Sequence, residues 1–187
     1  GISICNRFFS EIEKCSNINE IIILSLGNIP IKSLFHLYPD SDPNNSDMLI
    51  ARISQSGLGL PEKSFYFDTD KKAKDIRKKY LVLLKNIYSL LGFNSNESII
   101  QAKLQLKIET DIAEVSKNNV ELRDPISNTN KINFLELQKL TSLIDWKLIF
   151  KKLKINNKVS INVGQPLFIK NLDKIISKYS LEDWKKI

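Results

Sequence analysis

The sequence is poor in the residues that usually build metal centres and disulfides. It contains a single histidine, His36, and two cysteines, Cys5 and Cys15. A catalytic zinc site of the His-Glu-x-x-His kind needs at least two histidines, so the chain lacks the residues for one. We read residues 2–15 as one helix, which places Cys5 and Cys15 about 15 Å apart, too far for a disulfide. Both are expected to be unpaired small apolar residues.

Long apolar runs are missing as well. No stretch reaches the roughly 18 residues that a membrane span requires. The chain begins Gly1-Ile2-Ser3, without a Met and without the basic segment that opens a secretory signal peptide. We therefore expect no signal peptide and no membrane contact from this segment. The missing Met indicates either an excised piece of a longer protein or a residue left by a tag.

Known catalytic and phosphate-binding motifs are absent too. A Cys–His or Ser–His arrangement would have to use His36, and no serine lies in a nucleophile elbow. The Gly57-Leu58-Gly59 loop lacks the third glycine and the Gly-Lys-Ser/Thr of phosphate-binding loops, and Pro61 removes a backbone donor. A shaped crossover between two structured segments is the better interpretation of this loop, and we expect Gly57 and Gly59 to adopt backbone conformations closed to other residues. The residues alone predict no catalytic and no metal-binding side chains.

A calcium loop is the other metal site to weigh. Asp40, Asp42, Asn44 and Ser46 occupy alternate positions in "DSDPNNSD". An EF-hand loop needs Gly at its sixth position and Glu at its twelfth, and this stretch supplies neither. A polar turn is favoured over calcium binding.

The net charge of +7, with a pI near 9.3, permits an anionic partner. The lysines recur along the whole chain, whereas a nucleic-acid footprint clusters on one face. Asn, Ile and Lys are all abundant and all have AT-rich codons, so genome composition explains the charge better than nucleic-acid binding. A basic nucleic-acid-binding protein remains a third hypothesis, and no nucleic acid is expected as a partner.

What the sequence does contain is a mainly α pattern: a helical domain with one β-hairpin and short extended segments. Apolar periodicity predicts a helix at 20–29 after an Asn17 or Asn19 cap, a long helix from an Asp68 cap to Gly92, and another at 95–116. Shorter helices are expected after Asn133, which has Glu136 in capping-box spacing, and within residues 142–153, 165–179 and 180–187. Residues 158–163 alternate as a short strand or extended segment.

The hairpin is predicted from strands at 32–38 and 48–54, joined by a long loop of turn-forming residues. The long helix should bury one apolar stripe. The stripe comprises Ala73, Ile76, Tyr80, Leu83, Leu84, Ile87, Leu90 and Leu91.

At "SQSGLGLPEKSFYF" the chain resembles the N-terminal part of the neprilysin and endothelin-converting-enzyme family of zinc metallopeptidases. That family carries a Gly-Leu-Gly-Leu-Pro stretch, an aromatic pair and then a long helix. The resemblance continues in order through the hairpin, the helix "KIETDIAEV" with the Arg-Asp-Pro that follows it, and the segments up to "LEDWKKI". The residues that fit the family are Gln55, Gly57, Leu58, Gly59, Leu60, Pro61, Tyr66, Arg123, Asp124 and Pro125. The family usually has Trp where Lys117 stands and Tyr where Thr129 stands.

The resemblance implies that residues 1–187 are a single segment, the helical cap of a zinc metalloendopeptidase. It implies zinc in the full-length enzyme, a catalytic domain of the same polypeptide as partner, and peptides as substrates. The family's zinc-binding motif has no counterpart here, so the segment alone is expected to be inactive and to bind no zinc. It further implies a periplasmic, extracellular or membrane-anchored location. The alternative is a stand-alone helical module that binds peptides or proteins without enzymatic activity.

Overall fold

The computed structural model describes residues 3–27 and 33–187, and the side chains from Arg7 onward within those ranges. The predicted positions that fall on 1–2 and 28–32, and the side chains of Ile4 and Cys5, lie outside what it describes. The helices are α1 (Ser3–Glu13), α2 (Ile18–Leu26), α3 (Ser64–Phe67), α4 (Lys71–Leu90), α5 (Ser95–Val115), α6 (Asn119–Leu122), α7 (Phe134–Gln138), α8 (Trp146–Lys152), α9 (Pro166–Lys178) and α10 (Leu181–Lys185). The strands are β1 (Phe35–Asp42), β2 (Asn45–Gln55), β3 (Lys131–Ile132) and β4 (Ile161–Val163).

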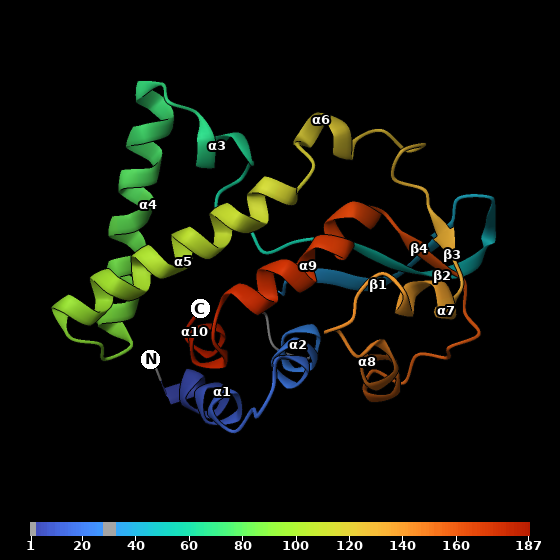
Figure 1. Ribbon diagram of the computed structural model, residues 1–187, viewed down its shortest axis with the longest axis horizontal. Helices are drawn as coiled ribbons and strands as arrows, with labels where there is room; N and C mark the ends of the chain where they lie inside the picture. Colours follow the sequence, from blue (N-terminus) through green and yellow to red (C-terminus); the bar gives the residue numbers. More distant parts are fainter. Residues whose placement is uncertain (1–2, 28–32) are drawn as a thin grey trace.

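The molecule has a helical end and a sheet end (Figure 1). Helices α4 and α5 pack on each other at one end, and the four strands lie at the other, in the order β1-β2-β4-β3. Helix α9 lies between the two ends and contacts α5. The mainly α class with a hairpin is confirmed. Among the described residues, no helix combines the length and the hydrophobicity needed to span a bilayer.

The sheet joins segments that are distant in sequence. Strand β2 pairs with β1 in an antiparallel hairpin and with β4 in parallel, and β3 adds to β4 in antiparallel register. The hydrophobic core at the sheet end is formed by side chains of the sheet and of helices α8 and α9. Phe35 and Trp146 illustrate it, with both rings fully buried and their centroids 5.1 Å apart.

The prediction of a long hairpin loop is wrong. The strands continue through the turn-type residues, so that Asp42 pairs with Asn45 and only two residues connect them. Pro39 is tolerated because β1 is an edge strand, where a missing N–H breaks no sheet bond. Two ion pairs stabilise this longer part of the hairpin. One joins Asp40 to Arg52 at 3.0 Å, and the other joins Asp42 to Lys131 at 2.6 Å.

Helix ends follow the local capping signals closely. Asn17, Asn94 and Asn133 cap α2, α5 and α7 through their side chains, and the caps of α5 and α7 are full capping boxes. The long helix α4 begins two residues later than predicted, because Asp70 accepts a bond from the Ala73 amide. Asp68 instead ends the short helix α3, which the sequence did not predict.

The predicted apolar stripe of α4 is only partly buried. Ala73 and Leu84 are buried, whereas Leu83, Ile87 and Leu90 are 53%, 41% and 68% exposed. Helix α4 packs mainly on α5 and α3, which together cover less of its surface than the stripe occupies. An uncovered apolar face therefore remains on α4.

Candidate functional site

The glycine loop at 56–63 is shaped by two different constraints. Gly57 has φ +93°, in the left-handed region that favours glycine. Gly59 does not, so the expectation that both glycines adopt conformations closed to other residues is wrong for Gly59. A Cβ atom at Gly59 would lie 1.8 Å from the Tyr80 hydroxyl oxygen and 2.9 Å from Glu109 Oε1. Glycine is required there by close approach, not by backbone conformation.

Glu109 organises the side chains around that loop. This residue of α5 is only 5% exposed and accepts four hydrogen bonds. Its Oε2 accepts from the Tyr66 hydroxyl at 2.6 Å and from the Gly59 amide at 3.2 Å. Its Oε1 accepts from the Tyr80 hydroxyl at 2.8 Å and from Gln105 Nε2 at 2.9 Å. Because every donor is neutral, the carboxylate is stabilised by hydrogen bonds alone, and it fastens the loop, α3 and α4 to α5.

The tyrosines near Glu109 are held in their neutral form. Burial and the hydrogen bond to Glu109 raise the pKa of Tyr66 well above its usual range. Burial and the charge of Glu109 likewise raise the pKa of Tyr80, and they raise the pKa of Tyr88 to about 12. These phenols are therefore hydrogen-bond donors at neutral pH, which suits a structural network better than proton transfer.

Gln55 joins the start of the same loop to the end of α5. Its Oε1 accepts from the Lys117 amide at 2.8 Å, and its Nε2 donates to the Lys117 carbonyl at 2.9 Å. The backbone N–H of Gln55 donates to Gln165 Oε1 at 2.8 Å. Lys63, at the other end of the loop, donates to the carbonyls of Glu114 and Ser116 and so caps the C-terminal end of α5. The loop is thus fixed to α5 from both ends.

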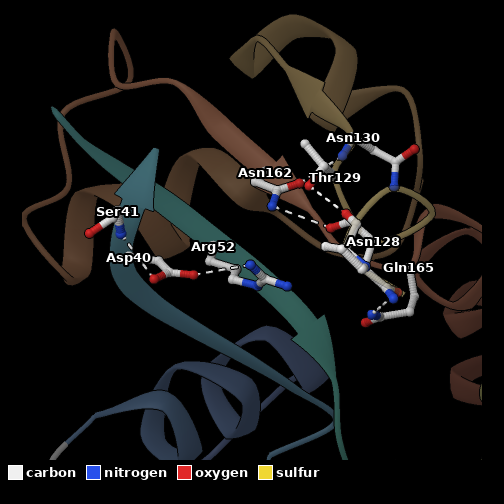
Figure 2. Close-up of polar contacts among 9 residues, drawn as sticks. Asp40, Ser41, Arg52, Asn128, Thr129, Asn130, Asn162 and Gln165 are labelled. Carbon is white, nitrogen blue, oxygen red and sulfur yellow. Dashed lines mark hydrogen bonds and ion pairs between the residues drawn. The ribbon is translucent and has the colours of Figure 1, made fainter. Parts of the chain in front are cut away.

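Buried amides extend this network to the segment 121–130 (Figure 2). Asn128, which is 2% exposed, accepts a bond from Gln165 Nε2 at 2.8 Å. Its own Nδ2 donates to the carbonyls of Glu121 and Asp124 at 2.7 and 2.6 Å. Asn162 of β4 in turn accepts from the Asn130 amide at 2.8 Å. These amides bind backbone groups and one another, which is the pattern of a structural network.

The Arg-Asp-Pro stretch is connected to Gln55 through Asn128. Hydrogen bonds from the Ser127 hydroxyl and the Ile126 amide lower the pKa of Asp124, which forms the turn that follows α6. The Pro125 carbonyl accepts from the Thr129 hydroxyl at 2.8 Å. Arg123 is exposed, and its guanidinium makes no hydrogen bond or ion pair within the described ranges. The structure therefore brings Gln55 and Asp124 into one network and leaves Arg123 at the surface.

An apolar groove lies beside the glycine loop, between α2, α4, α5 and α10. Its cavity volume is about 410 Å³. Gly57, Gly59, Tyr80 and Glu109 form part of its wall, and most of the remaining wall is isoleucine and leucine. In this groove the glycine loop and the Glu109 network lie beside exposed apolar side chains.

Comparison with known proteins assigns the family. A family model described as peptidase family M13 matches residues 11–187. The chain belongs to peptidase family M13. The resemblance to the N-terminal region of neprilysin and endothelin-converting enzymes is thereby confirmed.

Individual M13 relatives agree with this assignment. Human endothelin-converting enzyme-like 1 is 31% identical over 137 residues, which cover 73% of this chain and 18% of the relative. Endothelin-converting enzyme 1 of Cavia porcellus is 29% identical over 149 residues, or 76% of this chain and 20% of the relative. The chain therefore spans about a fifth of the length of these M13 proteins.

Solved M13 structures share the fold. The Mycobacterium tuberculosis zinc metalloprotease Zmp1, in complex with an inhibitor, superposes with a TM-score of 0.89 at 22% identity. The match covers all of this chain and 29% of Zmp1. PepO from Lactobacillus rhamnosis gives a TM-score of 0.75 at 12% identity, again over all of this chain.

Zinc does not fit the residues of this M13 chain. His36 is exposed on β1, and Cys15 is buried past the end of α1 with its thiol donating to the Glu11 carbonyl. In the part of the chain that the structure describes, no three His, Cys, Asp or Glu residues gather as metal ligands. Asp40 and Asp42 of the calcium-like stretch form ion pairs with Arg52 and Lys131 instead. That the chain binds no zinc stays a prediction.

The departures from the M13 pattern are accommodated by polar contacts. Lys117, where the family usually has Trp, donates from Nζ to the Ser127 carbonyl and to Asn128 Oδ1, both at 3.1 Å. Thr129, where Tyr is usual, holds the Pro125 carbonyl. The Lys117 hydrogen bonds therefore connect the end of α5 to the 125–130 segment, whereas the Thr129 hydrogen bond lies within that segment.

Several of these residues could not be identified from the sequence. Glu109, Asn128, Asn162 and Gln165 are polar residues whose partners lie on other elements, and no local spacing marks them. One feature of the sequence indicates a buried role for Glu109: it follows Gln105 by one helical turn and adjoins Ile108, on a helix face that must be buried.

Proposed function

We propose that this chain is the part of a zinc metalloendopeptidase that restricts access of substrates, and that the zinc centre is carried elsewhere in the same polypeptide. Membership of family M13 supports the first half of this proposal. The chain spans 18% of one curated relative and 29% of a zinc metalloprotease, which leaves most of such a protein for the catalytic part. The single histidine supports the second half.

The observation that carries the restricting role is the rigid attachment of the glycine loop. Gln55, Glu109 and Lys63 fix the loop to α5, and each contact uses a buried or half-buried group. A wall that limits substrates must hold its shape against them, and satisfied buried networks rigidify a structure. In this proposal the chain's residues position a surface and bind no reacting atom. Its partners are the catalytic domain and the peptides that pass it.

The test uses the complete gene product. We expect hydrolysis of short peptides but not of folded proteins, loss of hydrolysis with a zinc chelator, and recovery when zinc is restored. Gln55→Ala should raise cleavage of long substrates relative to short ones, because it loosens the loop. A change that merely harms the catalytic centre would lower both rates together. A gene that ends near this region, or a product without chelator-sensitive hydrolysis, would favour the stand-alone binding module.

A further inference from the structure

Helix α4 carries a stripe of lysines along its surface. The helix holds six lysines and Arg77 but a single acidic residue, Asp75. At 3.6 residues per turn, four of the lysines fall within an arc of about 60° and extend over about 21 Å of the helix axis. Helix α4 forms the outer edge of the helical end (Figure 1), and the groove beside the glycine loop is lined by other residues of α4. We call these four residues the lysine stripe: Lys71, Lys74, Lys78 and Lys85.

The charges of the lysine stripe have no partner in the part of the chain that the structure describes. Three of the lysines are exposed and Lys85 is half-buried, and none of their side chains forms an ion pair or a hydrogen bond within those ranges. Arg77 lies outside the stripe, and it donates to the carbonyls of Phe65 and Asp68 instead. The stripe therefore presents four positive charges that no ion pair of the described chain neutralises.

The placement of these lysines opposes the stability of the helix. Lys71 is the first residue of α4, where the helix dipole favours anions over cations. Lys74 follows it by three residues and Lys78 follows Lys74 by four, which are spacings at which like charges repel. The first turns of α5, α7 and α10 hold acidic residues, as the dipole favours. An AT-rich genome explains the number of lysines but not this placement, and local rules are broken mainly at functional sites.

The side chains of the stripe select among anionic ligands. Lysine ammonium groups are compact point charges and lack the planar fork with which arginine binds phosphate through two hydrogen bonds. Nucleic-acid bases would find no aromatic ring to stack on, because the hydroxyls of Tyr80 and Tyr88 are directed to Glu109 and Gln105. A helix surface is convex and cannot enclose a small anion. The ligand must therefore be an extended polymer that carries several carboxylates.

We propose that the lysine stripe binds acidic segments of polypeptide and so favours acidic peptides as substrates. The stripe is as long as about six residues of an extended peptide. Opposite charge also raises the rate at which a ligand reaches such a surface, and the net charge of +7 adds to that effect. This inference rests on the proposed function, because peptides are the polymers that a peptidase encounters.

The test compares two double variants of the complete gene product. The stripe variant combines Lys71→Glu with Lys78→Glu. The control variant makes the same change in net charge at the sheet end, with Lys147→Glu in the first turn of α8 and Lys158→Glu in an exposed loop. The probe is a fluorescent peptide of about eight residues, a little longer than the stripe when extended. In it D-glutamate alternates with glycine, so that it resists hydrolysis, and a second peptide has D-glutamine instead. Fluorescence anisotropy at low and high salt gives the dissociation constants.

We expect the stripe variant to bind the glutamate peptide at least about tenfold more weakly than the unchanged protein, and the control variant less than about twofold more weakly. The glutamine peptide should bind neither variant nor the unchanged protein appreciably, and high salt should weaken binding of the glutamate peptide. The stripe variant should unfold at a temperature no lower than the unchanged protein, because a carboxylate then replaces an ammonium group in the first turn of α4. Lost binding would therefore not be explained by lost folding.

Equal weakening by the two variants would overturn the proposal, because net charge and not the stripe would then set the affinity. Equal binding of the two peptides would overturn it as well. Tighter binding of duplex DNA, or of vesicles that contain phosphatidylglycerol, through the same lysines would assign the stripe to another polyanion and overturn the choice of acidic peptides. Because the probe is not hydrolysed, this result is separate from the hydrolysis of short uncharged peptides, which tests the proposed function itself.

Discussion

The Tyr80 hydroxyl lies where the side chain of any other residue at Gly59 would begin: a Cβ atom at position 59 would lie 1.8 Å from the hydroxyl oxygen and 2.7 Å from Cζ. The hydroxyl cannot easily move away, because it also donates to Glu109 at 2.8 Å. Glycine is therefore required at position 59 because Tyr80 is held in place by its hydrogen bond to the buried Glu109 carboxylate.

Gly59→Ala should destabilise the chain more than Gly92→Ala. At Gly59 the added methyl overpacks a buried contact, which typically costs about 1–3 kcal/mol or more. Gly92 has φ +97° but nothing within 4 Å of an added Cβ, so its cost is about 1 kcal/mol of backbone strain. Urea unfolding of both variants measures the difference. Tyr80→Ala should remove much of the Gly59→Ala effect in a double-mutant cycle, whereas additive losses would contradict the steric explanation.

Glu109→Gln should cost about 1–3 kcal/mol, because an amide nitrogen would face two donors that now bind a carboxylate oxygen. The matched control is Glu114→Gln, on the same helix but exposed, which should change stability by less than about 0.5 kcal/mol. Thermal unfolding of the two variants is the measurement. Similar midpoints for the two would show that the four bonds to Glu109 contribute little.

Alkaline pH should destabilise the fold through its buried phenols. The raised pKa values of Tyr66, Tyr80, Tyr88 and Tyr179 mean that the folded state keeps protons that the unfolded state releases near pH 10. The contribution is complete below pH 10 and is lost as the pH rises toward the folded values, about 12 for Tyr88. Urea midpoints at pH 8, 10 and 11 should fall in that order. Tyr88→Phe should make the fall less steep, and an unchanged slope would argue against a raised pKa at that position.

Gln55→Glu should destabilise the loop attachment by about 1–3 kcal/mol at neutral pH. A carboxylate can still accept from the Lys117 amide, but it cannot donate to the Lys117 carbonyl, and it would repel that oxygen. The exposed Gln138 of α7 offers the control Gln138→Glu. Amide hydrogen exchange at Lys117 should accelerate only in the Gln55 variant. Equal exchange in both variants would mean that the reciprocal pair is not what fixes this segment.

Local chemistry predicted much of the fold because its signals act over a few residues. Asn133 with Glu136 forms the capping box that its spacing predicts. The parallel pairing of β2 with β4 could not be predicted in the same way. It depends on only three residues of β4, which lie more than a hundred positions from their partners in β2.

The sequence motif of the candidate site could be predicted, but the tertiary contacts that hold its residues together could not. Gly57, Gly59 and Tyr66 could be identified by resemblance, yet the reason for Gly59 is a contact with Tyr80 that no spacing reveals. Glu109 gathers donors from positions 59, 66, 80 and 105, and only the packing of α4 on α5 brings them together. Buried polar networks of this kind are formed by tertiary structure, so a reading of periodicity misses them.

The central claim is that this chain supplies the substrate-restricting part of an M13 peptidase and that its own residues hold no metal. The most direct measurement is the zinc content of the purified 187-residue chain after incubation with zinc and dialysis, set beside that of the complete gene product. The account predicts one zinc per molecule in the complete product and no stoichiometric zinc in the 187-residue chain. One tightly held zinc per 187-residue chain would contradict it.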